Sequence, residues 1–120
     1  MSLARSSFPA KNTTSNGLGG TTTIIGNTMI VTGYFVGTTP YLTVTYPTYP
    51  AFTATPVISA LCSNSSDNAM NMFVSLAGPQ GLYDYAKPTT TGFTIDIFAG
   101  TGAYNAGGSY NLMFTAIGPI

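Results

Sequence analysis

The stretch "KPTTTGFTIDIF", residues 87–98, decides the fold because apolar and polar residues alternate along it. From position 92 onward, Phe93, Ile95 and Ile97 fall on one side of an extended chain, and Thr94, Asp96 and Phe98 fall on the other. A period of two residues is typical of a half-buried β-strand. The neighbouring residues show whether this strand stands alone or belongs to a larger pattern.

Runs of the same kind lie on both sides: "YLTVTY" (41–46), "VISALC" (57–62), "AMNMFVSLA" (69–77) and "YNLMFTAIGPI" (110–120). In "IIGNTMIVTGYF" (24–35), Gly26-Asn27 between two apolar runs predicts a hairpin. The nearly continuous apolar run at 57–62 suits an interior strand, and the prolines of 47–56 indicate a loop. No stretch is typical of a helix. The pattern predicts an all-β fold, an antiparallel β-sandwich or small barrel of seven or eight short strands.

Residues 1–23 differ from the rest of the chain in composition and in hydrophobic pattern. They contain no hydrophobic period and are rich in Ser, Thr, Asn and Gly. This composition predicts an extended N-terminal arm, residues 1–23, ahead of a β-sandwich domain, residues 24–120. Two positive charges and two apolar side chains of the arm are candidates for anchoring it to a neighbouring protein: Arg5, Phe8, Lys11 and Leu18.

Charged residues make up only 5% of the 120 residues, three basic and three acidic, with no His. Without His or Glu the usual acid–base groups of enzymes are missing, so we expect no catalysis, and the sequence indicates no cofactor or metal. Three basic residues neutralise few phosphates, which disfavours nucleic acid as a partner. No apolar run is long enough for a membrane helix. The single Cys62 is expected to be a small buried hydrophobe.

A resemblance adds to this interpretation. The ordered series "YLTVTYPTYPAFTATPVISAL", "TTTGFTIDIF" and the terminal "YNLMFTAIGPI" resembles the C-terminal tip domains of phage tail fibres, which are related in fold to H-type lectins. The resemblance covers residues 24–120 and implies a compact sandwich that associates as a homotrimer. Phe114 stands where members of that family commonly carry Trp, and the polar sugar-binding set of the animal lectins is not recognisable.

Tyr and Asn on loops are adaptable binding groups. The candidates for contact with a host-surface glycan or with a neighbouring subunit are therefore Tyr83, Asp84, Tyr85, Tyr104 and Asn105. Ordinary turn packing is the alternative role for these residues. Phe93 and Phe114 are expected in the core.

Two function classes follow from these observations. The first is a protein of the virion surface, a fibre or spike tip that attaches the particle to its host. The second is a capsid decoration protein that binds no receptor, and a cellular lectin is a more distant third. The arm is expected to contact other virion proteins in either of the first two cases.

Overall fold

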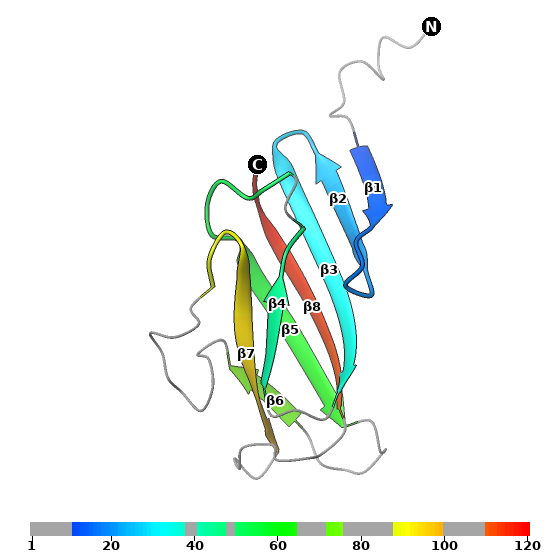
Figure 1. Cartoon of the computed structure of the whole chain (residues 1–120), viewed down its shortest axis with the longest axis vertical. Helices are drawn as coiled ribbons and strands as arrows, with labels where there is room; N and C mark the ends of the chain where they lie inside the picture. The colour runs from blue at the N-terminus through cyan, green and yellow to red at the C-terminus, as the bar shows by residue number, and fades with distance from the viewer. Residues whose placement is uncertain (1–10, 38–40, 48–49, 65–71, 76–87, 100–109) are drawn as a thin grey trace, which may run out of the picture.

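A computed structural model of the chain describes residues 11–37, 41–47, 50–64, 72–75, 88–99 and 110–120. These residues contain eight strands and no helix (Figure 1). The strands are β1 (Lys11–Ser15), β2 (Thr21–Ile25), β3 (Thr28–Gly37), β4 (Tyr41–Thr45), β5 (Val57–Asn64), β6 (Met72–Ser75), β7 (Gly92–Ala99) and β8 (Tyr110–Pro119). They form a five-stranded sheet in the order β1-β2-β3-β8-β5 and a three-stranded sheet in the order β4-β7-β6. Every pairing is antiparallel, so the predicted all-β antiparallel fold is confirmed.

The predicted hairpin at Gly26-Asn27 is also confirmed. Gly26 and Asn27 form the two-residue turn between β2 and β3, where Ile25 pairs with Thr28. Gly26 has a φ of 59°, a value that L residues with a side chain seldom adopt. Two-residue hairpins need such a residue because its twist matches that of the flanking strands.

The stretch that opened the sequence analysis becomes the middle strand of the smaller sheet. A turn built on Thr89 precedes β7: the Thr89 Oγ1 accepts from the N–H of Thr91 at 3.2 Å and of Gly92 at 3.3 Å. The Thr89 N–H donates to the Gly92 carbonyl at 2.9 Å. This local bonding fixes where the strand begins, after which β7 pairs with β4 on one edge and β6 on the other.

Large and small residues alternate across the inner face of the β3–β8 pair. Four cross-strand pairs each join a bulky side chain to a small residue or glycine: Met29–Gly118, Val31–Ala116, Gly33–Phe114 and Gly37–Tyr110. A Cβ on Gly33 would collide with the Phe114 ring, so the glycine leaves the space which that ring fills. Such pairing interlocks the two strands without voids.

The two sheets share one core. The Phe93 ring of β7 meets the Phe114 ring of β8 edge to face, with centroids 5.1 Å apart and planes at 75°. Tyr46 extends this cluster, contacting Phe52 at 5.1 Å and Phe93 at 5.9 Å between centroids. Edge-to-face aromatic pairs contribute about 0.5–1.5 kcal/mol beyond the area they bury. Phe93 and Phe114 are both 3% exposed, so the core assignment made for them is confirmed.

The division of the chain at residue 23 needs correction. Residues 11–15 and 21–25 form β1 and β2, which pair with each other and extend the five-stranded sheet beyond β3. The segment between them returns to β3, where the Leu18 carbonyl accepts from the N–H of Tyr34 at 2.9 Å. Threonine is β-branched and suits strands, and ladder hydrogen bonds offset the ordering cost that favoured an unfolded arm.

The assignment of residues 57–62 to an interior strand is also wrong. Among the described strands, β5 lies at one edge of the five-stranded sheet. Its inner residues Ile58, Ala60 and Cys62 pack against the core, whereas Val57 and Leu61 are exposed on the outer side. The run is continuously apolar because both faces of β5 carry apolar residues.

Candidate functional site

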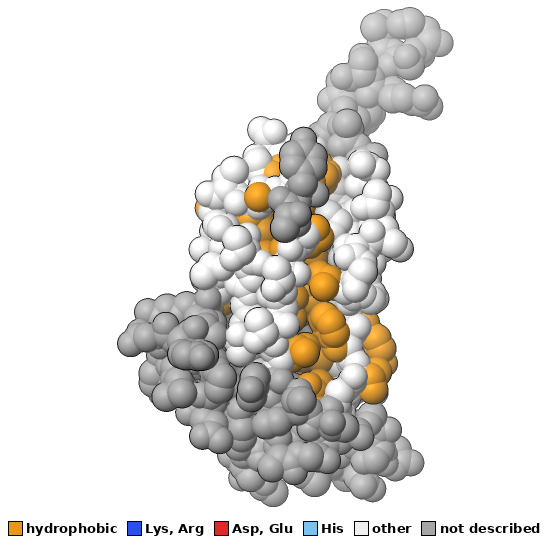
Figure 2. All heavy atoms as spheres, in the orientation of Figure 1, with side chains coloured by type: hydrophobic (Ala, Val, Ile, Leu, Met, Phe, Trp, Pro, Cys, Tyr) orange, Lys and Arg blue, Asp and Glu red, His pale blue; other side chains and the backbone are white. Residues whose placement is uncertain are grey.

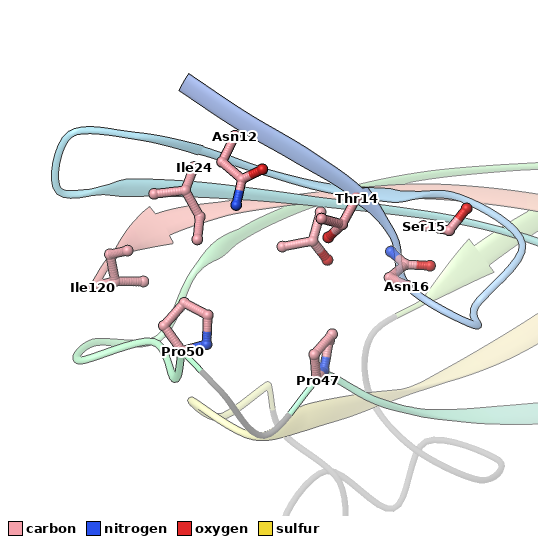
Figure 3. A pocket seen from close by; sticks show the side chains of 9 residues that line it. Asn12, Thr14, Ser15, Asn16, Ile24, Pro47, Pro50 and Ile120 are labelled. Atoms are coloured by element: carbon pink, nitrogen blue, oxygen red, sulfur yellow. The ribbon is translucent and has the colours of Figure 1, made fainter. Parts of the chain in front are cut away.

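The larger sheet is wider than the smaller one, and this difference creates a pocket. In Figure 1 the strands β1 and β2 lie to one side of β4. A pocket of about 620 Å³ lies against their inner face. Its lining residues are Asn12, Thr14, Ser15, Asn16, Thr22, Ile24, Pro47, Pro50 and Ile120 (Figure 3). This volume falls within the range of about 300–1,000 Å³ that is usual for small-molecule sites.

One wall of the pocket is polar. The register places Asn12 opposite Ile24 and Thr14 opposite Thr22, so an amide and two hydroxyls lie on neighbouring positions of β1 and β2. Thr22 is 6% exposed, and its Oγ1 has no hydrogen-bond partner. A buried polar atom left unpaired costs about 1–3 kcal/mol. Protein atoms enclose this hydroxyl, so the polar side chains of β1 that a ligand can reach are those of Asn12 and Thr14, which are both exposed.

Asn16, at the end of β1, has a different role. Its Nδ2 donates to the Thr32 carbonyl at 2.8 Å, and its Oδ1 accepts from the N–H of Leu18 at 2.9 Å. Both ends of the amide are therefore engaged in holding the β1–β2 turn against β3. These two bonds hold Asn16 in place in the pocket lining and leave one N–H and one oxygen lone pair of its amide unused by them.

The opposite wall is apolar. Figure 3 shows Pro47 and Pro50 facing the strands across the pocket, with Ile120 at one end. Ile120 is held in place because its N–H donates to the Asn27 carbonyl at 2.8 Å. None of the described residues that line the pocket is charged. A site with hydroxyl and amide groups on one side and carbon on the other suits an uncharged amphipathic ligand.

Tyr46, which is buried, and Cys62, which is half-buried, titrate abnormally. Burial raises the pKa of the Cys62 thiol to about 11 and raises the pKa of the Tyr46 phenol well above its usual value. Both groups are therefore neutral at pH 7. A thiol of raised pKa is a poor nucleophile, so Cys62 shows none of the activation that catalytic cysteines have. The Tyr46 Oη also has no hydrogen-bond partner.

Only some of the site residues predicted from the sequence lie in the part of the chain that the structure describes. The five loop candidates, Tyr83, Asp84, Tyr85, Tyr104 and Asn105, lie outside the described residues, as do Arg5 and Phe8 of the arm. Lys11 is the first residue of β1 and pairs with Ile25. Leu18, proposed as an anchor, instead packs against the core of its own domain and is half-buried. Leu18 is therefore held within the sandwich.

The pocket residues were missed by sequence reasoning because 12–22 had been assigned to the arm. The available signal was the threonine run before Ile24, since β-branched residues favour strands. Across the described ranges, no three His, Cys, Asp or Glu side chains gather where they could hold a metal ion. The same residues contain no helix long and apolar enough to span a membrane.

Comparison with protein-family models, with curated proteins and with solved structures gave no match for this chain.

Proposed function

We propose that this chain is a structural module of a phage virion surface, a fibre or spike tip that attaches the particle to its host by binding a neutral glycan. The observation that carries the proposal is the pocket between β1–β2 and the prolines Pro47 and Pro50, whose described lining residues are uncharged. The order of the β-rich segments, which resembles fibre-tip domains, supports the particle assignment. In this proposal the protein works as a homotrimer and carries out no catalysis.

The chemistry of the pocket favours a sugar over other small molecules. A pyranose ring presents hydroxyls at its edges and carbon–hydrogen bonds on its faces. Asn12 and Thr14 can exchange hydrogen bonds with the edge hydroxyls, while Pro47 and Pro50 offer carbon surface to a ring face. A charged ligand would find no countercharge among the lining residues and would lose its hydration.

Glycan binding by purified protein tests the proposal. We expect neutral glycans to be retained on an array, and Thr14→Val to weaken that binding about tenfold, or ~1.4 kcal/mol, by removing one exposed hydrogen-bonding group of the pocket at constant shape. The matched control is Thr45→Val, an exposed threonine of β4 on the outer face of the other sheet. Absence of glycan binding, or equal binding by both variants, would refute the receptor role.

A decoration protein without receptor binding is the second candidate. It is favoured by apolar side chains on the outer face of the five-stranded sheet, such as Val57 and Leu61, which a capsid lattice would bury. Immunogold imaging of particles that carry the protein separates the two functions. Label on the tail fibres supports attachment, whereas label spread over the capsid supports decoration.

A further inference from the structure

The outer face of the five-stranded sheet concentrates the exposed apolar surface of the described residues. The exposed large hydrophobic side chains are Ile25, Tyr34, Val36, Val57, Leu61, Met113 and Ile117. The strand registers place all seven on this one face, opposite to the core. Val57 is 78% exposed and Leu61 69%, so these side chains lie almost entirely in water. Contiguous apolar surface of this kind is uncommon on monomers.

The other side of the molecule is different. Figure 2 views the molecule from the side of β4 and β7, where the surface over β4 is mostly white, the colour of uncharged polar groups and backbone. Thr43 of β4 and Thr94 of β7 pair on this face and join their hydroxyls at 3.0 Å, with Thr43 exposed and Thr94 only 7% exposed. A stripe of apolar side chains runs beside β4 in the same view, but none of the exposed large hydrophobic side chains of the described residues lies on the outer face of β4.

Apolar side chains on the outer face form rows that cross the strands. One row joins Ile30, Ile117 and Val57, and a second joins Tyr34, Met113 and Leu61. Between them runs a row of small polar residues, Thr32, Thr115 and Ser59. The apolar rows are four residues apart along each strand, or roughly 13 Å, so the face consists of two ridges and a groove. A neighbouring copy has the same two ridges, and one of them would fit into this groove.

Charge and area also fit a second copy. None of the outer-face residues in these three rows is charged, so the rows offer no electrostatic attraction to a charged partner. Lys11 stands opposite Ile25 at the β1 edge of the face, outside the rows. Strands β3 and β8 have ten residues, β5 eight and β2 five. At about 3.3 Å per residue and about 4.8 Å between strands they present roughly 520 Å², before the side-chain relief is counted. This is about two-thirds of the ~800 Å² that each partner buries in a standard stable interface.

We infer that the outer face of β2, β3, β8 and β5 is the surface through which copies of this chain join. In a trimer each copy turns this face toward the three-fold axis, where it packs against the faces of both neighbours. The assembled protein then has a second apolar layer outside the sandwich core. The inference concerns assembly alone and does not require the pocket to bind a sugar.

Light scattering on the purified full chain tests the inference. We expect the wild type at three times 12.4 kDa, as the homotrimer proposal requires. Met113→Asp puts a charge on the second ridge and should give a monomer of 12.4 kDa, with association weakened at least 100-fold. The control is Thr45→Asp on the other outer face, which should leave the mass unchanged.

Circular dichroism must show that each variant keeps its β-sheet spectrum. If Met113→Asp does not fold, the double variant Leu61→Thr with Met113→Thr flattens the ridge with a strand-forming residue and should also give a monomer. A wild-type mass of twice 12.4 kDa would support the face and contradict the trimer. A wild-type monomer would overturn the inference and assign the face to a different protein or to a lipid surface.

Discussion

The ring of Phe114 occupies the space that a side chain at position 33 would need, and it also meets Phe93 of the opposite sheet. One residue thus joins the two sheets and interlocks β3 with β8. We expect Phe114→Ala to lower the free energy of unfolding by about 3–5 kcal/mol, measured by urea denaturation. Tyr83→Ala and Tyr104→Ala, at loop positions outside the described residues, should cost much less. The reverse order would mean that the core is wrongly assigned.

Gly33 is the complementary half of that contact. Gly33→Ala should cost about 1–3 kcal/mol, because the added methyl group collides with the Phe114 ring. Phe114→Leu replaces the ring with a smaller side chain. The double variant should therefore lose less unfolding free energy than the sum of the losses of the two single variants. A double-mutant cycle measures this coupling, and strict additivity would show that the two positions do not share the space.

The raised pKa values of Cys62 and Tyr46 predict that the folded protein loses stability in alkali. In the folded protein Cys62 keeps its proton to about pH 11, whereas the unfolded thiol ionises near 9.0. The folded state therefore holds more protons between pH 9 and 11, and the free energy of unfolding falls as pH rises through that range. Tyr46 adds to the fall above pH 10.

The variant Cys62→Ala isolates the contribution of the thiol. Urea denaturation of wild type and variant between pH 7 and 11 should give parallel curves up to about pH 8.5 and a smaller fall for the variant above it. Identical slopes throughout would show that the thiol is as accessible in the folded chain as in the unfolded one.

At the scale of strands, β1 and β2 are parts of the folded sheet. Deleting residues 1–23 removes β1 and most of β2, uncovers the edge of β3 and removes Leu18 from the core. We expect that deletion to lower stability by several kcal/mol and to promote aggregation through the new edge. Deleting residues 1–10 ends before β1 and should change the free energy of unfolding by less than about 1 kcal/mol. Equal stability of the two deletions would restore the division at residue 23.

How well each strand could be predicted depended on the contrast between its two faces. In β4 and β7 apolar core residues such as Val44 and Ile95 alternate with mostly polar ones, so the period of two was visible. In β8 the inward residues also recur every second position, although Met113 and Ile117 on the outer face are apolar. In β1 and the first part of β2 both faces are polar, and no alternation could appear. In β5 both faces carry apolar residues, which looked like full burial. Alternation in the sequence reveals a strand only where one face is apolar and the other polar. It gives little information where the two faces have the same polarity.

The pocket could not be predicted for a different reason. Its polar wall comes from residues 12–22, and its apolar wall comes from Pro47, Pro50 and Ile120. Only the β1–β2 register and the turn of the chain after β4 bring these segments together. No local motif marks such a site, since each residue type is common in loops.

For the whole molecule, the low charge has a measurable consequence for assembly. If copies join through the outer face, their association constant should stay within about twofold between 50 and 500 mM NaCl, because screening has no charge pair to act on. Sulfate should strengthen association by favouring apolar burial. Sedimentation equilibrium measures both effects. A tenfold loss in NaCl would place the contact instead at the few charged residues, Arg5, Lys11 and Lys87 among them.

The position of β8 also determines when the chain can fold during synthesis. Gly33 and its partner Phe114 are 81 positions apart, and β8 is the strand that joins β3 to β5. At about 5–20 residues per second, a ribosome needs roughly 4–15 s to pass from the end of β3 to the start of β8. During that interval β3 and β5 have no partner strand between them. Folding of the five-stranded sheet therefore waits until β8 has been synthesised, and holdase chaperones that cover apolar strands in those seconds would raise the yield in the cell.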